Sequence, residues 1–243
     1  MSSSRLLSLL HLLSLSLLFQ LALGDGLALY TCYGSGNFTP NGTYNKNLDN
    51  LFTFLDSETP LTGFASSSQG LSQNETYGFA LCRGDLNTTD CQACVDKATN
   101  EIQEVCQFKN EGFQYNDVCK VKYSNISFLG SVSTKVWTYI LSTNNASDPV
   151  SFNRTVIDLV SQLKELASDS PKLYAAGDQP LATENSTVYG FVQCTRDISA
   201  ANCSTCIDFA IKVVVADMYG REGGRFIGEN CDIRYEIYPF LLG

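Results

Sequence analysis

Two stretches of the sequence, CRGDLNTTDCQAC at residues 82–94 and CTRDISAANCSTC at residues 194–206, share one spacing of cysteines. Both follow the pattern C-x8-C-x2-C, and each cysteine of the second stretch lies 112 residues after its counterpart in the first. A further pair, Cys119 and Cys231, keeps the same separation. Four matched cysteines at one constant offset indicate a tandem duplication, so we expect two small modules, each stapled by disulfides.

The N-terminal segment predicts the compartment. Residues 1–24 have a weakly basic start that ends at Arg5, a Leu-rich stretch at 6–23 and a closing small-residue pattern, Ala22-Leu23-Gly24. This is the layout of a secretory signal peptide, and an uncleaved membrane anchor is the alternative. His11 and the serines inside the stretch favour the signal peptide. We therefore expect a secreted, soluble mature chain without a transmembrane helix, in an oxidising compartment where disulfides persist.

The composition is acidic, with 25 Asp and Glu, 16 Lys and Arg and a formal net charge of −9. An acidic chain without a basic cluster is a poor binder of nucleic acid and of anionic membranes. Nine N-x-S/T sequons suit an exposed, glycosylated extracellular protein, although Asn202 is a doubtful acceptor because Cys203 occupies the middle of its sequon. We expect glycosylation at the other eight sites, Asn37, Asn41, Asn74, Asn87, Asn125, Asn145, Asn153 and Asn185.

The repeat extends to the predicted secondary structure. Apolar residues recur at i, i+4, i+7, i+8 and i+11 in both halves, which predicts an amphipathic helix over 44–55 and another over 152–163. Each half continues with a strand-like segment (76–81 and 187–193), a second helix beginning near Asp90 or Asn202, and strand-rich sequence around Cys119 or Cys231. The sequence thus predicts two α+β modules at 25–141 and 151–243, joined by a linker at 142–150.

The cysteine count constrains the disulfides. Counterparts of Cys32 and Cys106 are missing from the second repeat, and their joint loss indicates that these two residues are bonded to each other. The remaining four cysteines of each repeat allow three pairings, and a bridge between Cys91 and Cys94 on one helix has poor geometry. Two pairings stay open. We favour Cys82–Cys91 with Cys94–Cys119, and correspondingly Cys194–Cys203 with Cys206–Cys231.

The residue inventory argues against an enzyme. The only histidine, His11, lies in the segment expected to be removed. Ser-His-Asp catalysis, Cys-His catalysis and histidine-ligated metal sites are therefore excluded from the mature chain. The C-x2-C spacing also occurs in zinc sites and redox motifs, but an oxidising compartment disfavours the thiolates that those sites need. We expect no enzyme activity, no metal and no cofactor.

Residues around the cysteines carry a family resemblance. Tyr-Gly-Phe precedes the signature at 77–79 and 189–191, and Arg234-Tyr235-Glu236 is followed by Tyr238-Pro239-Phe240. With two C-x8-C-x2-C modules behind a signal peptide, the chain resembles the plant cysteine-rich repeat secretory proteins, which are built from tandem ginkbilobin-homologous, or stress-antifungal, domains. The resemblance covers essentially the whole mature chain. It implies two helices on a roughly five-stranded antiparallel sheet in each module, together with the disulfide pairing favoured above.

The same resemblance implies a location and a general role. Receptor-like kinases and plasmodesmata-located proteins of this superfamily append a transmembrane helix, whereas this sequence stops just after the second module. It therefore resembles the secreted branch, which implies an apoplastic protein of plant defence or stress response.

The resemblance also implies a sugar-binding site, but only some of its residues are present in this sequence. Single-domain ginkbilobin binds mannose and inhibits fungal growth through an Asn after the first cysteine, an Arg six residues before the last and a Glu five residues after it. The first repeat has Tyr33, Phe113 and Ser124 at these positions. The second repeat matches with Arg225 and Glu236, and Asn144 or Asn145 is a loose substitute for the Asn.

Two functions follow from this partial match. In the first, the second module recognises mannose-containing glycans and the protein is antifungal. In the second, Arg225 and Glu236 form an ion pair on the sheet, and the protein binds an extracellular receptor domain or associates with itself.

Overall fold

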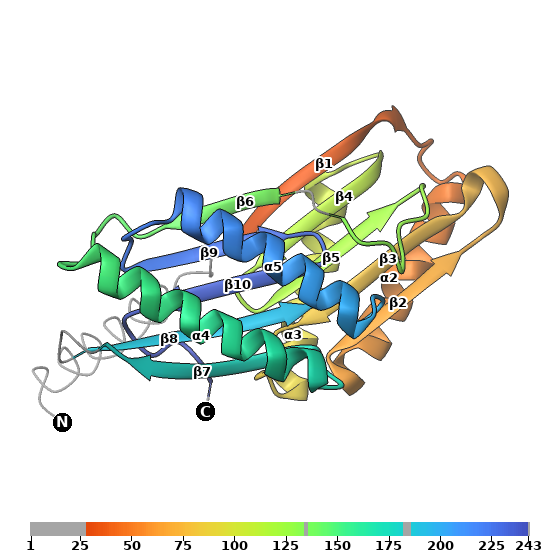
Figure 1. Cartoon of the computed structure of the whole chain (residues 1–243). Helices are drawn as coiled ribbons and strands as arrows, with labels where there is room; N and C mark the ends of the chain where they lie inside the picture. The colour runs from red at the N-terminus through yellow and green to blue at the C-terminus, as the bar shows by residue number, and fades with distance from the viewer. Residues whose placement is uncertain (1–27, 134–135, 182–185, 243) are drawn as a thin grey trace, which may run out of the picture.

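The computed structural model describes residues 28–133, 136–181 and 186–242, so the expected signal peptide at 1–24 lies outside the described residues. Long α-helices and two antiparallel sheets make up the described chain (Figure 1). The helices are α2 (Thr43–Thr62), α3 (Thr88–Val105), α4 (Pro149–Asp169) and α5 (Ala200–Asp217). In these ranges, no helix combines the length and the apolar character that crossing a membrane requires.

The two halves have the same topology, with strand order β1-β4-β5-β3-β2 in the first sheet and β6-β9-β10-β8-β7 in the second. The first sheet consists of β1 (Ala28–Asn37), β2 (Phe64–Gln69), β3 (Thr76–Cys82), β4 (Lys109–Asn116) and β5 (Cys119–Ser124). The second consists of β6 (Val136–Leu141), β7 (Tyr174–Pro180), β8 (Thr187–Cys194), β9 (Gly223–Gly228) and β10 (Cys231–Glu236). The expected α+β fold of two modules, each with two helices on a five-stranded antiparallel sheet, is confirmed.

The helices form where the apolar stripes predict them. Leu51 and Leu55 of α2 and Val156 and Val160 of α4 are at most 1% exposed, because each stripe packs on its own sheet. The second helices start two residues earlier than expected. Side-chain caps explain this difference, since Asn87 accepts a hydrogen bond from the backbone N–H of Asp90, as Ser199 does from that of Asn202.

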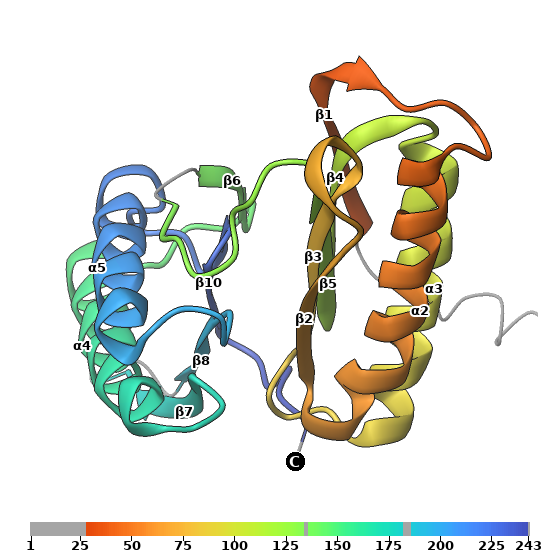
Figure 2. The ribbon, with the colours of Figure 1, turned by 90° about the vertical axis from the view of Figure 1, so that its right-hand side faces the viewer.

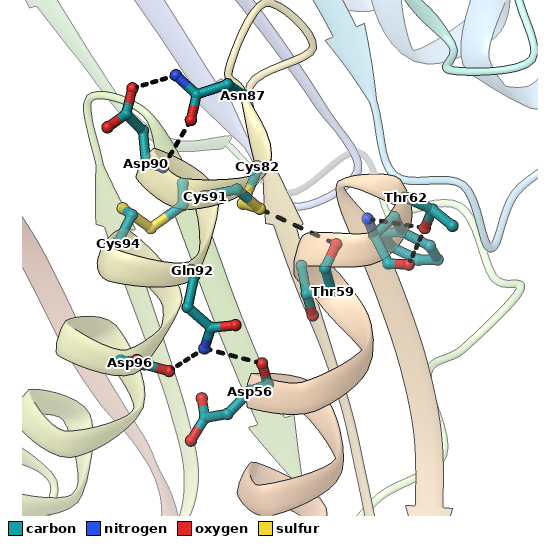
Figure 3. Close-up of a disulfide and its surroundings, with 12 residues drawn as sticks. Asp56, Thr59, Thr62, Cys82, Asn87, Asp90, Cys91, Gln92, Cys94 and Asp96 are labelled. Carbon is teal, nitrogen blue, oxygen red and sulfur yellow. Dashed lines mark hydrogen bonds between the residues drawn. A yellow bond between two sulfur atoms is a disulfide. The ribbon is translucent and has the colours of Figure 1, made fainter.

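Five disulfides staple the modules, and none of the ten cysteines is free. The structure pairs Cys32–Cys106, Cys82–Cys91, Cys94–Cys119, Cys194–Cys203 and Cys206–Cys231, which are the pairs that we favoured. Cys82–Cys91 ties the end of β3 to the first turn of α3, beside the carbonyl of Thr59 near the end of α2 (Figure 3). Its counterpart, Cys194–Cys203, ties β8 to α5 in the second module.

The position of the module boundary differs from our expectation. We placed 136–141 in the first module and a linker at 142–150, whereas β6 (Val136–Leu141) is the edge strand of the second sheet and α4 already begins at Pro149. The described chain leaves the first sheet after Ser124, so the connection runs before β6. The boundary was misplaced because β6 lacks the cysteine that marks its counterpart, β1.

The missing disulfide of the second module is replaced by apolar side chains. Cys32 lies opposite Gly112 in the first sheet, and Leu141 lies opposite Gly224, the counterpart of Gly112, in the second. At the other end of the bond, Met218 occupies the C-cap of α5, as Cys106 does in α3. Met218 is 1% exposed, and Leu141 packs against the same core cluster.

The two sheets face each other, and the helices cover their outer faces (Figure 2). Side chains of β3 alternate accordingly, with Ala80 and Cys82 in the helix-side core and Phe79 and Leu81 on the opposite face. The buried cluster between the sheets, called the junction core below, consists of Phe79, Leu81, Phe113, Tyr115 and Ile227. Because it draws residues from both modules, the tandem packs as one unit.

Candidate functional site

The two residues carried over from the sugar site, Arg225 on β9 and Glu236 on β10, lie near each other on the second sheet. Arg225 Nε is 4.0 Å from Glu236 Oε1, and the two side chains are 12% and 10% exposed. Arg225 also binds Asp117 of the first module, so this side chain is directed into the space between the sheets. The structure therefore brings the expected pair together at the junction.

The charges of this pair are already compensated. Burial opposes the charge of Arg225, but the Asp117 carboxylate next to it outweighs that effect and raises the pKa of the guanidinium. On the neighbouring strand, Arg234 donates through Nε to Glu236 Oε1 at 3.0 Å and through Nη2 to the Tyr238 hydroxyl. A sugar hydroxyl would have to compete with charged groups that are desolvated and mutually bonded.

The structure does not place the third group of the sugar site with Arg225. Ser142, the counterpart of Tyr33, lies at the edge of the second sheet, where its N–H donates to Gly223. The two alternatives, Asn144 and Asn145, are exposed on the following loop. Asn144 accepts a backbone hydrogen bond from Glu222, and Asn145 forms an isolated bridge with Arg221.

The corresponding positions of the first module hold other residue types, and two of the three are buried. Phe113 is fully buried in the junction core. Ser124 is 2% exposed, and its Oγ accepts a hydrogen bond from the N–H of Ile126. Tyr33 is half-buried on β1. Of the three positions, only that of Phe113 contributes to the packing between the modules.

Sequence reasoning missed charged residues inside the junction. Lys120 Nζ binds Asp232 Oδ2 at 2.7 Å, with side-chain exposures of 2% and 7%, and Lys122 binds Glu229. A signal for the first pair was present, since Lys120 and Asp232 each directly follow a matched cysteine, Cys119 or Cys231. Opposite charges thus occupy the same position of the two repeats and meet across the junction.

Cation–aromatic contacts repeat in both modules. Lys122 Nζ lies 3.8 Å from the ring centroid of Phe128, and the guanidinium carbon of Arg234 lies 3.9 Å from that of Phe240. In each case the ring packs on a second phenylalanine, with centroids 6.0 and 6.1 Å apart for the pairs Phe79–Phe128 and Phe191–Phe240. All three members of one set lie 112 residues before those of the other, so the same arrangement recurs at equivalent positions of the two modules.

The sequons differ in their surroundings. Asn37, Asn74 and Asn125 line one cavity of about 270 Å³ at the distal end of the first module, and Asn41 is exposed beside it. Asn87 and Asn145 are exposed as well. Asn153 differs from the other described sequons, because it lies within α4 with only 9% of its surface exposed. Asn185 lies outside the described residues.

Comparison with known proteins establishes the family. The model of the salt stress response/antifungal domain matches twice, at residues 31–126 and 141–238. The chain belongs to this family. A Castanea crenata antimicrobial ginkbilobin-2-like protein is 40% identical over 86% of this chain and 87% of its own length. Cysteine-rich repeat secretory protein 38 of Arabidopsis thaliana is 39% identical over 85% and 82%.

Solved structures support the tandem fold of this chain. The tandem DUF26 ectodomain of Arabidopsis thaliana PDLP8 matches with a TM-score of 0.79 at 20% identity, covering 88% of this chain and 99% of the other. That of PDLP5 matches with a TM-score of 0.75 at 24% identity, covering 88% and 100%. The resemblance to the cysteine-rich repeat secretory proteins is therefore confirmed at the level of family and fold.

The described part of the chain contains no cluster of metal-ligating side chains. Across residues 28–133, 136–181 and 186–242, no three His, Cys, Asp or Glu side chains cluster so that they could hold a metal ion. The buried charges at the junction are instead paired with one another, as Lys120 is with Asp232 and Arg225 with Asp117.

Proposed function

We propose that this chain is a secreted, non-enzymatic protein of plant defence or stress response that acts in the apoplast by binding another extracellular protein. The observation that carries the proposal is the bond between Arg225 and Asp117, which occupies the guanidinium that mannose recognition would need. The relatives named as antimicrobial and secretory proteins support the defence role and the location.

The partner we favour is an extracellular receptor domain. The tandem fold matches ectodomains of receptor-like proteins, which are also tandems of two modules. The segment after β10 exposes apolar side chains, with Ile237, Tyr238 and Leu242 38–50% exposed. Exposed apolar and aromatic side chains are typical of protein-binding surfaces.

Mannose binding with antifungal activity is the second candidate. Arg225 and Glu236 occupy the matching positions of the second module, and the name of the 40% identical relative points to antimicrobial activity. This candidate requires the ligand to displace Asp117 from Arg225.

Affinity capture from apoplastic fluid separates the two candidates. The immobilised secreted protein is compared with Arg225→Ala and with a matched control, Arg154→Ala, which removes an exposed arginine that forms no ion pair in the described structure. We expect all three proteins to capture the same receptor ectodomain and mannose to release none of it. Release by mannose, with capture lost in Arg225→Ala alone, would instead favour the sugar-binding candidate.

A further inference from the structure

A cavity lies where the two modules meet, away from the Arg225–Glu236 pair. Its volume is about 220 Å³, and its walls include the end of α2, the loop between β3 and α3, and three side chains of the second module, Lys172, Gln193 and Arg196. The Cys82–Cys91 disulfide fixes the first-module wall (Figure 3). Because both modules contribute, a single module would lack this cavity.

Arg196 lines the cavity and forms no ion pair with any residue that the structure describes. Its Nη2 donates to the carbonyl of Thr62, and its guanidinium carbon lies 5.5 Å from the ring centroid of Phe64. The Nε atom is buried and has no hydrogen-bond partner in the described structure. Burial lowers the pKa of this guanidinium, and no carboxylate opposes the shift. A half-buried guanidinium with a buried, unpartnered Nε is stabilised by an anion that completes its contacts.

The other charges lining the cavity are also positive. Lys172 is exposed, donates to the carbonyl of Gly84 at 3.0 Å and forms no ion pair with a described residue. Arg83 is neutralised by Asp85, which binds both of its donating nitrogens. The lining contains no Asp or Glu, although the whole chain has a net charge of −9. Two uncompensated cations therefore face one small space.

We propose that this cavity binds a small ligand carrying an oxyanion, either a carboxylate or a sulfate, through Arg196 and Lys172. The planar donor fork of Arg matches the geometry of both groups, and Lys adds a point charge. Thr62, Thr88 and Gln193 also line the space. Gln193 Nε2 and Thr62 Oγ1 already donate to backbone carbonyls, which leaves the acceptor oxygens of these side chains for a ligand with hydroxyls. Because drug-sized ligands occupy roughly 300–1,000 Å³, the volume fits a smaller ligand such as an acidic monosaccharide.

Calorimetric titration at low ionic strength tests the site with three probes: sodium D-galacturonate, sodium sulfate and neutral D-galactose. The variant Lys172→Ala/Arg196→Ala removes both cations. The control Arg154→Ala/Lys212→Ala removes the same charge from exposed positions on α4 and α5. Asn87 is a sequon that lines the cavity, so the secreted protein is measured before and after enzymatic removal of its N-glycans.

We expect galacturonate, sulfate or both to bind the wild type and the control with similar affinity. The affinity of the double variant for the same anion should be at least tenfold lower. Galactose should bind none of the proteins. The stronger of the two anions identifies the oxyanion, and binding that appears only after glycan removal also supports the site. Absence of anion binding to the deglycosylated wild type, equal binding of galactose and galacturonate, or unchanged binding to the double variant would overturn the proposal. If the double variant does not fold, Lys172→Glu at the exposed position replaces it under the same criteria.

Discussion

At the position of Asp56, the two modules carry side chains of opposite charge. Asp56 lies on α2, its Oδ1 accepts a hydrogen bond from Thr99, and burial, aided by the nearby Asp96, raises its pKa to about 6. In the second module the corresponding residues are Lys164 and Asp208, which form an ion pair at 2.8 Å. The duplication thus left two neighbouring carboxylates in one module and an opposite-charge pair in the other.

The raised pKa of Asp56 predicts a pH dependence of stability. With a folded pKa of about 6 and an ordinary value of 3.8, the folded state binds the extra proton between these values. The stabilisation from this proton is complete below about pH 4 and is lost as pH rises through 6. Asp56→Asn keeps an oxygen for Thr99 and removes the charge.

We therefore expect Asp56→Asn to raise the melting temperature relative to wild type more at pH 7.5 than at pH 4.5, as measured by calorimetry at both values. Asp158→Asn, at an exposed position of α4, serves as the control and should show no such difference. An equal shift of the Asp56→Asn protein at both pH values would contradict this interpretation of the buried carboxylate.

At the scale of elements, the sequence carried most of the information. Apolar stripes predicted α2 and α4, and the matched cysteines predicted α3, α5 and the strands beside them, because core burial and disulfide spacing are local features of the sequence. The helix starts were missed by two residues, because the capping side chains of Asn87 and Ser199 are polar and precede the apolar pattern. The edge strand β6 was misassigned because an apolar residue replaces its cysteine.

One test asks whether Leu141 and Met218 of the second module do the structural work of the Cys32–Cys106 disulfide of the first. In it, the two cysteines are replaced by the residues that the second module has at these positions. Removal by Cys32→Ala/Cys106→Ala should cost about 2–4 kcal/mol of the free energy of unfolding. Cys32→Leu/Cys106→Met should cost less, because Leu141 and Met218 fill the equivalent places. Chemical denaturation of the three proteins gives the comparison, and equal losses in both variants would contradict the equivalence.

At the scale of the whole molecule, the junction joins the two modules through buried apolar and charged side chains, and the sequence predicted this part of the structure least. Cross-module contacts such as Arg225–Asp117 join residues far apart in the chain, and no local pattern indicates that two sheet faces will meet. Arg225 and Glu236 were found only through the family resemblance, which gave their positions but not their burial. The opposite charges at the matched positions 120 and 232 were the one available signal.

The Lys120–Asp232 pair predicts a strongly non-additive mutant cycle. Lys120→Met or Asp232→Leu alone leaves a buried charge without a partner and should cost about 3–5 kcal/mol, whereas the double variant should be close to wild type or more stable. Unfolding in denaturant, followed by fluorescence and circular dichroism, measures the cycle and should show one transition. Additive losses, or two separate transitions, would mean that the modules do not depend on this contact.

Binding to a mannan array is the most direct test of the central claim that Arg225 and Glu236 close the junction and do not recognise mannose. Wild type, Arg225→Ala and Arg154→Ala are applied beside a known mannose-binding lectin as a positive control. The account predicts no mannan binding by any of the three proteins. Wild-type binding that Arg154→Ala retains and Arg225→Ala loses would contradict it.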